Sequence, residues 1–250
     1  RKIRNTFRYL LGNLNDVYED IDLENVDIKK LPELEQFMLH KMYNLNLNFN
    51  KSFNNYDFHN LYKELLNFCN VDLSAFYFDV RKDTLYCDQK NSEKRKSTIM
   101  LLNIILNSLL KWFAPILSFT TEEIYQLMIK KNKSIHLEKF LNFPKKFENL
   151  ALNEKWLELL KIRDLCNLSI EEKRANKEIG SSLEASLNVH LDKQSIETVK
   201  GIDLAELFIT SSVEIEKTVS EKIIVKTNKA KGNKCPVCWK IYLDKCPRHG

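Results

Sequence analysis

The chain has 250 residues and a net charge of +5. Its residues are 44% hydrophobic and 29% charged, as in a soluble globular protein of one large domain or two to three small ones. Only five glycines and five prolines are present, so we expect long helices with few turns. Residues 1–5 carry charge but neither an apolar run nor a cleavage site, so we expect no signal peptide there. The first residue is not methionine, so we expect a piece of a longer chain.

The basic charge is concentrated near the end of the sequence. Residues 222–250 hold eight Lys or Arg and one acid, Asp244, a net +7. That leaves 31 basic and 33 acidic residues, a net −2, for residues 1–221. Such a patch suits a polyanion, nucleic acid above all, although a merely soluble tail is the alternative. The scattered Cys69, Cys87 and Cys166 stand in or near apolar stretches and are expected to be reduced, which favours a cytoplasmic protein.

Apolar residues at helical spacing predict a bundle of six helices in the first part of the chain. The expected helices are residues 1–18, a helix from Pro32 weakened at its far end by the Asn-rich stretch 44–55, about 55–67, 92–113, 120–128 and 153–178. Thr120 and Glu123 have capping-box spacing, and Gly180 is placed to terminate the last helix. Residues 19–31 and 132–150 are expected to be polar connections. The aromatic segment 71–86 is interpreted as a helix-to-helix crossover, with a catalytic or binding turn as the alternative.

Residues 92–113 are the most apolar stretch, and we expect them to form the central helix of the bundle. Asn103, Asn107 and Lys111 recur at i, i+4 and i+8 and make one polar face, so the apolar length is too short for a membrane span. The basic cluster at residues 94–96 lies at the amino end, where the helix dipole disfavours cations. An anionic partner would compensate for this charge.

The period changes after Gly180. Residues 183–191 are apolar at odd positions, which predicts a strand, and 207–209, 213–215 and 223–225 are expected to be further short strands. The fold class is therefore mainly α. We predict a helical domain at residues 1–178, a small α+β unit at 179–232 and a metal-binding tail at 233–250.

Two pairs of ligand-type residues close the sequence. Cys235 and Cys238 have C-x2-C spacing, and Cys246 and His249 have C-x2-H spacing. Two such turns complete a tetrahedron, so the pattern predicts a structural Zn²⁺ site with no open position. A surface cysteine cluster without metal, or a disulfide pair, is the alternative.

No catalytic constellation stands out in the sequence. It has no Gly-rich phosphate loop, no Ser/His/Asp set and no paired carboxylates, and His40, His59, His136 and His190 are isolated. We expect these 250 residues to be non-catalytic.

Several stretches together resemble one family across essentially the whole chain. Residues 1–14, 73–86, 113–125 and 177–185 resemble the anticodon-binding domain of bacterial isoleucyl-tRNA synthetases, which are class I aminoacyl-tRNA synthetases. Cys-Pro-Val-Cys-Trp at 235–239 resembles the terminal zinc finger of that family, in which a fourth cysteine usually stands where this chain has His249. The helical motifs are shared with valyl, leucyl and methionyl relatives, whereas the zinc knuckle favours the isoleucyl branch.

The resemblance implies a part of an enzyme that joins isoleucine to its tRNA using ATP and Mg²⁺. The two ATP-site signatures, similar to His-Ile-Gly-His and Lys-Met-Ser-Lys-Ser, are missing here, so the catalytic and editing domains are expected upstream of Arg1. The partners expected are the isoleucine-accepting tRNA and that upstream domain, with no membrane and a monomeric state. Candidate tRNA-binding residues are Arg4, Arg8, Lys94, Arg95, Lys96, Lys231, Lys234 and Arg248 for phosphates and Trp239 for base stacking, although Trp239 packed against the zinc knuckle is equally compatible with the sequence. A stand-alone zinc-knuckle nucleic-acid binder and a purely structural helical scaffold are the rival interpretations.

Overall fold

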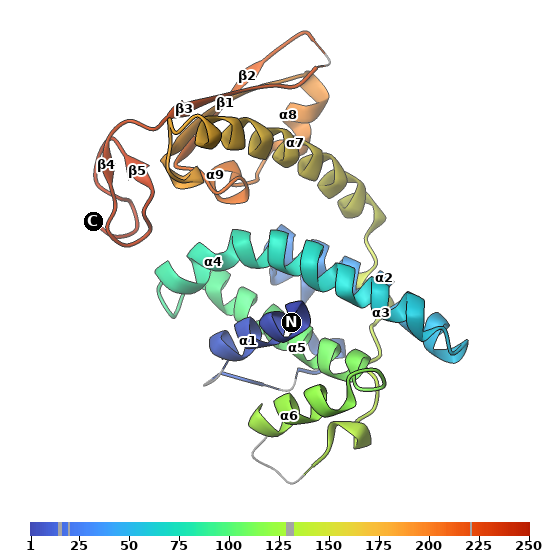
Figure 1. Cartoon of the computed structure of the whole chain (residues 1–250). Helices are drawn as coiled ribbons and strands as arrows, with labels where there is room; N and C mark the ends of the chain where they lie inside the picture. Colours follow the sequence, from blue (N-terminus) through green and yellow to red (C-terminus); the bar gives the residue numbers. More distant parts are fainter. Residues whose placement is uncertain (15–16, 20, 129–132, 221) are drawn as a thin grey trace. The chain divides into compact units, whose positions relative to one another are not determined.

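A computed structural model describes residues 1–14, 17–19, 21–128, 133–220 and 222–250. The chain forms two compact units, Arg1–Asn149 and Leu150–Gly250 (Figure 1). The first unit is helical, and the second combines helices with a small sheet. The predicted fold class, a mainly helical chain with a small α+β part and a terminal cysteine cluster, is confirmed. Within the described residues, none of the helices combines the length and the apolarity needed to cross a bilayer.

The first unit is built around one apolar helix. Its helices are α1 (Lys2–Leu14), α2 (Glu33–Asn54), α3 (Phe58–Asn67), the π-helix η3 (Phe68–Tyr77), α4 (Phe78–Cys87), α5 (Glu93–Phe113) and α6 (Ser118–Met128), with four short 3-10 turns at Leu23–Asn25, Ile28–Lys30, Ile135–Leu137 and Lys145–Phe147. Helix α5 packs against α1, α2, α3, α4 and α6 (Figure 1). The expected central helix is thus confirmed, and Ser92 caps it by accepting the Arg95 N–H at 3.1 Å.

The polar face predicted for this helix is buried. Asn103 and Asn107 are nearly inaccessible, and the Tyr18 hydroxyl lies 2.8 Å from Asn107 Oδ1. The Lys111 ammonium lies 3.8 Å from the Glu138 carboxylate. The connecting segments therefore cover the polar stripe and satisfy its hydrogen bonds, so it faces protein and not water.

Helix α2 continues through the Asn-rich stretch that was expected to weaken it, so this expectation is wrong. Asn46 is buried and accepts a hydrogen bond from Trp112 Nε1 at 3.2 Å, and Phe49 is fully buried. Tertiary packing outweighs the low helix propensity of asparagine.

The crossover predicted at residues 71–86 is also wrong, because η3 and α4 continue directly from α3. Leu73, Phe76, Tyr77 and Val80 are buried and recur at three- and four-residue spacing, which is the spacing of one helix face. The run of aromatic residues concealed this period.

The capping box predicted at residues 120–123 is not formed. Helix α6 already begins at Ser118, and the Thr121 N–H donates to Leu117 O at 3.0 Å, so Thr120 lies inside the helix. Glu123 instead pairs with Arg4. The first predicted helix, 1–18, ends at Leu14 as α1; positions 15–16 of that prediction lie outside the described residues.

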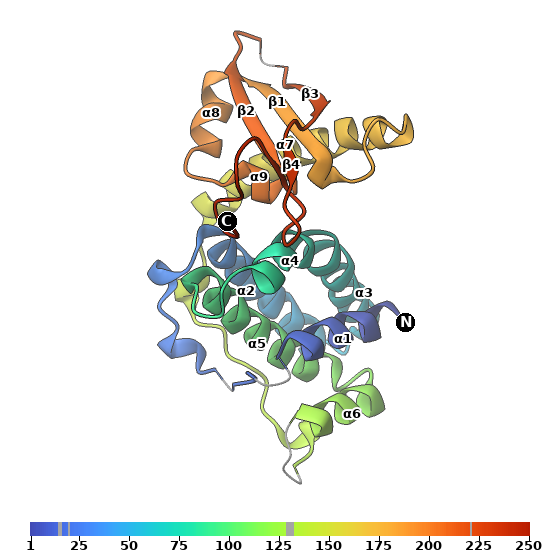
Figure 2. The same cartoon turned by 90° about the vertical axis from the view of Figure 1, so that its left-hand side faces the viewer.

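The second unit joins one long helix to a three-stranded sheet. Its elements are α7 (Leu150–Ala175), β1 (Ala185–Leu191), α8 (Lys193–Val199), α9 (Leu204–Leu207), β2 (Ser212–Lys217), β3 (Ile224–Lys229), β4 (Asn233–Lys234) and β5 (Ile241–Tyr242), with a 3-10 turn at Ser182–Glu184. Strand β1 is central, parallel to β2 and antiparallel to β3. Figure 2 shows the three strands side by side with α7 behind them. The strand predicted at residues 183–191 is confirmed from Ala185 on, because every second residue of β1 is buried, whereas residues 183–184 belong to the 3-10 turn.

Helix α7 ends earlier than expected, and Gly180 is not its terminator. The chain turns at Lys177, which adopts a left-handed φ of 59°. The Glu178 N–H returns to Lys173 O at 3.0 Å, as in a Schellman-type end. The strand expected at 207–209 is also wrong: Asp203 caps the short helix α9 by accepting the Glu206 N–H, and Ile209 makes a left-handed turn.

Candidate metal centre and basic surface

The last residues fold into two tight turns around the β4–β5 hairpin. The Cys235 N–H donates to Lys240 O at 2.9 Å, and the Trp239 N–H donates to Cys235 O at 3.0 Å. A second turn follows at Cys246, whose carbonyl accepts the Gly250 N–H at 2.9 Å. Gly232 enters the hairpin with φ 124°, and a Cβ there would lie 2.1 Å from Tyr242 O, so only glycine fits.

The turns bring the four predicted ligands to one point. Ligand atoms of Cys235, Cys238, Cys246 and His249 all lie within 4.8 Å of one another. His249 Nδ1 is 3.5 Å from Cys235 Sγ and 3.3 Å from Cys246 Sγ, and Cys238 Sγ is 3.9 Å from Cys246 Sγ. A tetrahedral zinc ion with bonds near 2.3 Å would separate sulfur ligands by about 3.8 Å. The residues therefore fit a four-coordinate metal ion.

The environment of the cluster favours thiolate at two positions, since the pKa values of Cys235 and Cys246 are both lowered by hydrogen bonds. Backbone N–H groups of Cys238 and Val237 point at Cys235 and, with His249, lower the pKa of the Cys235 thiol to about 6. Burial raises the pKa of Cys238, its neighbour in the cluster. All described cysteines are free thiols, and the Cys238–Cys246 separation is far above a disulfide bond of about 2.05 Å. The geometry favours the metal interpretation over the disulfide alternative.

Trp239 stands on the outside of the cluster. Its side chain is 60% exposed and its backbone adopts a left-handed φ of 64°, which is unusual for a bulky residue. The Lys234 ammonium lies 5.7 Å from the centre of the Trp239 ring. The ring is thus presented to solvent beside a cation, and the predicted packing against the knuckle accounts for only part of its surface.

The predicted phosphate contacts fall into three groups. Lys231, Lys234 and Arg248 are exposed around the metal cluster, and Lys234 lies 3.7 Å from Glu184. Of these three residues, Lys234 is the one that the structure places beside Trp239, at 5.7 Å from its ring centre. Lys240, in the same segment, is buried, at 8% exposure. The sequence did not predict this burial, because nothing distinguishes Lys240 from the exposed basic residues around it.

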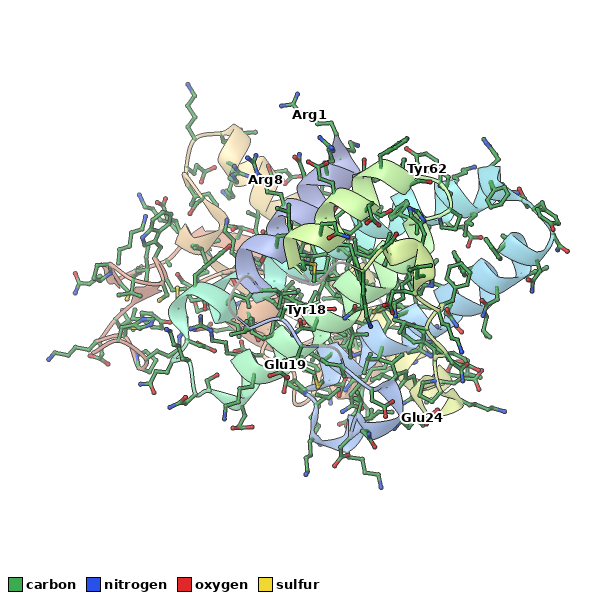
Figure 3. The ribbon with its side chains drawn as sticks, turned by 90° about the horizontal axis from the view of Figure 1, so that it is seen from below. Arg1, Arg8, Tyr18, Glu19, Glu24 and Tyr62 are labelled. Atoms are coloured by element: carbon green, nitrogen blue, oxygen red, sulfur yellow. The ribbon has the colours of Figure 1, made fainter. Side chains whose placement is uncertain are left out.

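Arg4 and Arg8 form the second group, on α1. Both side chains are exposed, and Figure 3 shows Arg8 on the outside of the helix. Arg4 is bound to Glu123 at 2.7 Å, so it must exchange this partner before it contacts a phosphate. Arg8 is therefore the better candidate of the two.

Lys94, Arg95 and Lys96 form the third group, at the start of α5. Arg95 donates to Asp88 O at 2.8 Å, and Lys96 pairs with Glu93 at 2.8 Å. Arg95 and Lys96 also line a cleft of about 470 Å³ together with Lys90, a third cation that the sequence analysis did not single out. The sequence offered little indication that Lys90 belongs to this group, because it is a single lysine that precedes the predicted helix.

The segment that was considered as a catalytic turn carries a buried ion pair. Arg81 binds both carboxylate oxygens of Glu35, at 2.7 and 2.6 Å, and the Tyr77 hydroxyl donates to Glu35 at 3.0 Å. Both charged side chains are at most 3% exposed, so the pair joins α2 to α4 inside the core and is not accessible to a substrate.

Comparisons with known proteins agree on one family. The family described as "Anticodon-binding domain of tRNA ligase" matches residues 35–191. A protein of Pelagibacter ubique named isoleucine–tRNA ligase is 66% identical over 249 residues, which is 100% of this chain and 28% of that protein. Proteins of the same name from Agrobacterium fabrum and Bartonella quintana are 37% and 36% identical over 98% of the chain. The chain spans about a quarter of the length of these relatives.

Proposed function

Because the chain belongs to the family of anticodon-binding domains of tRNA ligases, we propose that it is the tRNA-binding portion of an isoleucine–tRNA ligase. The observation that carries the proposal is the 66% identity, along the entire chain, to a relative of that name. Since the match covers 28% of that relative, the ATP- and Mg²⁺-dependent catalytic domain and the editing domain belong to other parts of the protein, upstream in this proposal. The working partner is isoleucine-accepting tRNA, and the compartment is the cytoplasm.

The proposed contacts are of two kinds: some bind phosphates of the tRNA, and one stacks on a base. Arg4, Arg8, Lys94, Arg95, Lys96, Lys231, Lys234 and Arg248 would hold phosphates, and Trp239 would stack on an unpaired base. The exposure of Arg8, Lys231, Lys234 and Trp239 supports this assignment. Base stacking on an aromatic ring contributes about 1–3 kcal/mol and is largely independent of sequence.

Cys235, Cys238, Cys246 and His249 are the proposed ligands of one structural Zn²⁺ ion. The mutual distances of their ligand atoms support a tetrahedral site in which the protein fills all four positions. The metal supplies folding energy and a fixed geometry for the surrounding cations, and it leaves no open position for chemistry.

The test compares RNA ligands and activity on the purified chain. We expect tight binding of the isoleucine-accepting tRNA, weaker binding of duplex DNA, and no isoleucine-dependent ATP–pyrophosphate exchange. The slope of log affinity against log salt should become shallower when Lys231, Lys234 and Arg248 are replaced by glutamine, by about one unit for each lost phosphate contact. Lys193, Lys200 and Lys217, replaced together by glutamine, are the control of equal charge in the same unit.

Three results would reject the proposal. Equal affinity for duplex DNA and tRNA would favour the stand-alone nucleic-acid binder. No binding to either ligand would favour a structural scaffold. Preference for a valine-, leucine- or methionine-accepting tRNA would move the chain to one of those relatives.

A further inference from the structure

We infer that Ser211 and Lys240 clamp the metal knuckle onto the sheet and thereby position the Trp239 ring, a role that deepens the proposed RNA binding and rests on it. The knuckle is defined as residues 233–250. The four proposed metal ligands all lie inside the knuckle, so other contacts must attach it to the rest of the second unit. Besides the Lys234–Glu184 pair at 3.7 Å, two side chains do so: Ser211, in the turn between α9 and β2, and Lys240, which reaches α9.

The first contact is a relay through one hydroxyl. Ser211 Oγ accepts the backbone N–H of Ile241 in the knuckle at 2.6 Å. The same hydroxyl donates to Leu183 O at 2.5 Å, in the 3-10 turn Ser182–Glu184 that leads into β1. Ser211 also ties its own backbone to the sheet, because its N–H donates to Ala185 O at 3.1 Å. One side chain thus connects strand β5 of the knuckle to the start of the central strand of the sheet.

The second contact is made by a buried lysine. Lys240 is 8% exposed, and its ammonium lies 3.4 Å from Ala205 O in α9. The same carbonyl accepts the Thr210 N–H at 2.9 Å, so the ammonium adds a second contact to it. The neighbouring Thr210 Oγ1 is fully buried without a hydrogen-bond partner among the described residues. The Lys240 side chain is largely buried, although its ammonium makes a contact of only 3.4 Å, so we assign this residue a positional role.

Positioning follows from the geometry between Lys240 and Trp239. The two residues are adjacent, and one is buried while the other is 60% exposed. The backbone between them is closed by two hydrogen bonds with Cys235, one from Cys235 N–H to Lys240 O and one from Trp239 N–H to Cys235 O. With the Lys240 side chain held against α9, the left-handed backbone of Trp239 directs the indole ring outward. The clamp therefore decides where the ring points.

The chain offers a selective probe of this ring. It contains three tryptophans, and Trp112 and Trp156 are buried at 0% and 2% exposure. Acrylamide quenching of steady fluorescence therefore reports mainly Trp239, and the fast part of the anisotropy decay reports its local motion.

The experiment uses the zinc-loaded 250-residue chain with Lys240→Met and Ser211→Ala. Ser211→Thr keeps the hydroxyl, and Lys245→Met removes an exposed charge from the same knuckle as the matched control. We expect one zinc per chain in all variants, together with faster local motion of Trp239 in Lys240→Met and Ser211→Ala. Ser211→Thr and Lys245→Met should retain the motion of the parent chain.

The affinity of the chain for the anticodon stem-loop of the isoleucine-accepting tRNA is measured next. It separates the effect of ring position from the effect of a lost lysine charge. Trp239→Ala should weaken affinity about 5- to 150-fold, the equivalent of one lost base stack. Lys240→Met should weaken affinity about twofold or more when Trp239 is present and add little in the Trp239→Ala background, because the two changes act through one ring. Lys245→Met should have the same effect in both backgrounds.

Unchanged Trp239 motion in both clamp variants with full metal content would overturn the inference. Loss of the metal in both variants would also overturn it, because the two residues would then act on ligand geometry and not on the ring. If Trp239→Ala leaves RNA affinity unchanged, the proposed stacking fails, and the anisotropy measurement still decides whether the clamp holds the ring.

Discussion

The buried pair of Glu35 and Arg81 is the most demanding charge arrangement in the first unit. Desolvation of both charges is offset only while each retains its partner, and Tyr77 and Thr98 direct further hydroxyls at Glu35. Removal of one charge leaves the other buried and unpaired. We therefore expect Glu35→Gln to lower the free energy of unfolding by about 3–5 kcal/mol, measured by urea denaturation.

The exposed pair of Arg4 and Glu123 supplies the matched control. The Arg4 guanidinium lies 2.7 Å from the Glu123 carboxylate, a distance similar to that in the buried pair, but the two side chains are 64% and 61% exposed. Glu123→Gln should change stability by about 1 kcal/mol or less, because water screens the pair. Similar losses for the two variants would show that Glu35 contributes no more than a surface acid.

His40 makes the first unit sensitive to acid. Its ring is buried, Nδ1 accepts the Asn149 N–H at 3.0 Å, and Nε2 lies 3.0 Å from the Asn44 amide. Burial lowers the pKa of His40 below 6.5, although the nearby Glu148 opposes the shift. The unfolded chain therefore binds this proton first, and stability is lost as pH falls from 6.5 through the lower folded pKa.

The measurement is the free energy of unfolding between about pH 7.5 and pH 5, where the slope reports the proton taken up on unfolding. His40→Gln should flatten the slope, because glutamine does not titrate and its carbonyl oxygen still accepts the Asn149 N–H. His136→Gln makes the same substitution at an exposed histidine and is the control for the change of side chain itself. A slope that survives in His40→Gln would assign the acid sensitivity to other groups.

At the scale of elements, the knuckle is the segment that we expect to need the proposed metal ion for its folding. Few of its residues are apolar, and Val237, Trp239 and Leu243 are exposed, so burial contributes little to its folding. Metal ligation in small zinc modules supplies roughly 10 kcal/mol or more. Cys238→Ser should therefore release the metal and unfold residues 233–250, while α1–α6 remain folded.

Metal analysis and amide hydrogen exchange test this expectation. Rapid exchange should appear in β4 and β5 and remain absent from α5. Cys69→Ser is the control, because Cys69 is buried in the first unit and contributes no ligand atom to the cluster. Stoichiometric metal in both Cys238→Ser and His249→Ala would reject the site.

The sequence predicted those helices and strands in which hydrophobic residues repeat with one clear period. The prediction failed where backbone hydrogen bonds or tertiary contacts determined the structure. The apolar face of α5 and the alternation of β1 were recognised because burial repeats without interruption. The left-handed end of α7 was misplaced, since Lys177 carries no glycine signal and the turn is held by backbone hydrogen bonds. The spacing of Cys235, Cys238, Cys246 and His249 was enough to predict that the four side chains converge. The burial of Lys240 depends on a contact with α9 that only the fold creates.

At the scale of the whole molecule, the structure groups α7 with the sheet that follows it. Trp156 and Ile170 are buried, Ser169 lies 2.7 Å from Thr227 of β3, and Arg163 donates to Leu207 O at 3.1 Å. These contacts all belong to the unit Leu150–Gly250. The division into residues 1–178, 179–232 and 233–250 stays a prediction, and fragments test it.

We expect a fragment of residues 1–149 to unfold cooperatively and a fragment of 1–178 to be no more stable. In the longer fragment α7 lacks the sheet, so Trp156 should emit like a solvent-exposed indole, whereas Trp112 should remain buried in both. Urea denaturation and the difference in emission spectra measure this. A clear stability gain in the 1–178 fragment would support the original boundary.

The clamp between Ser211 and the knuckle has a consequence for biosynthesis. Strands β1, β2 and β3 and the Ser211 hydroxyl all precede Cys235 in the chain, so the docking surface emerges from the ribosome before the first metal ligand. At about 5–20 residues per second, the ligands from Cys235 to His249 follow within about one to three seconds. We therefore expect the nascent tail to meet a folded sheet, and the proposed metal ion to close a loop that the Ser211 hydrogen bond already holds in place.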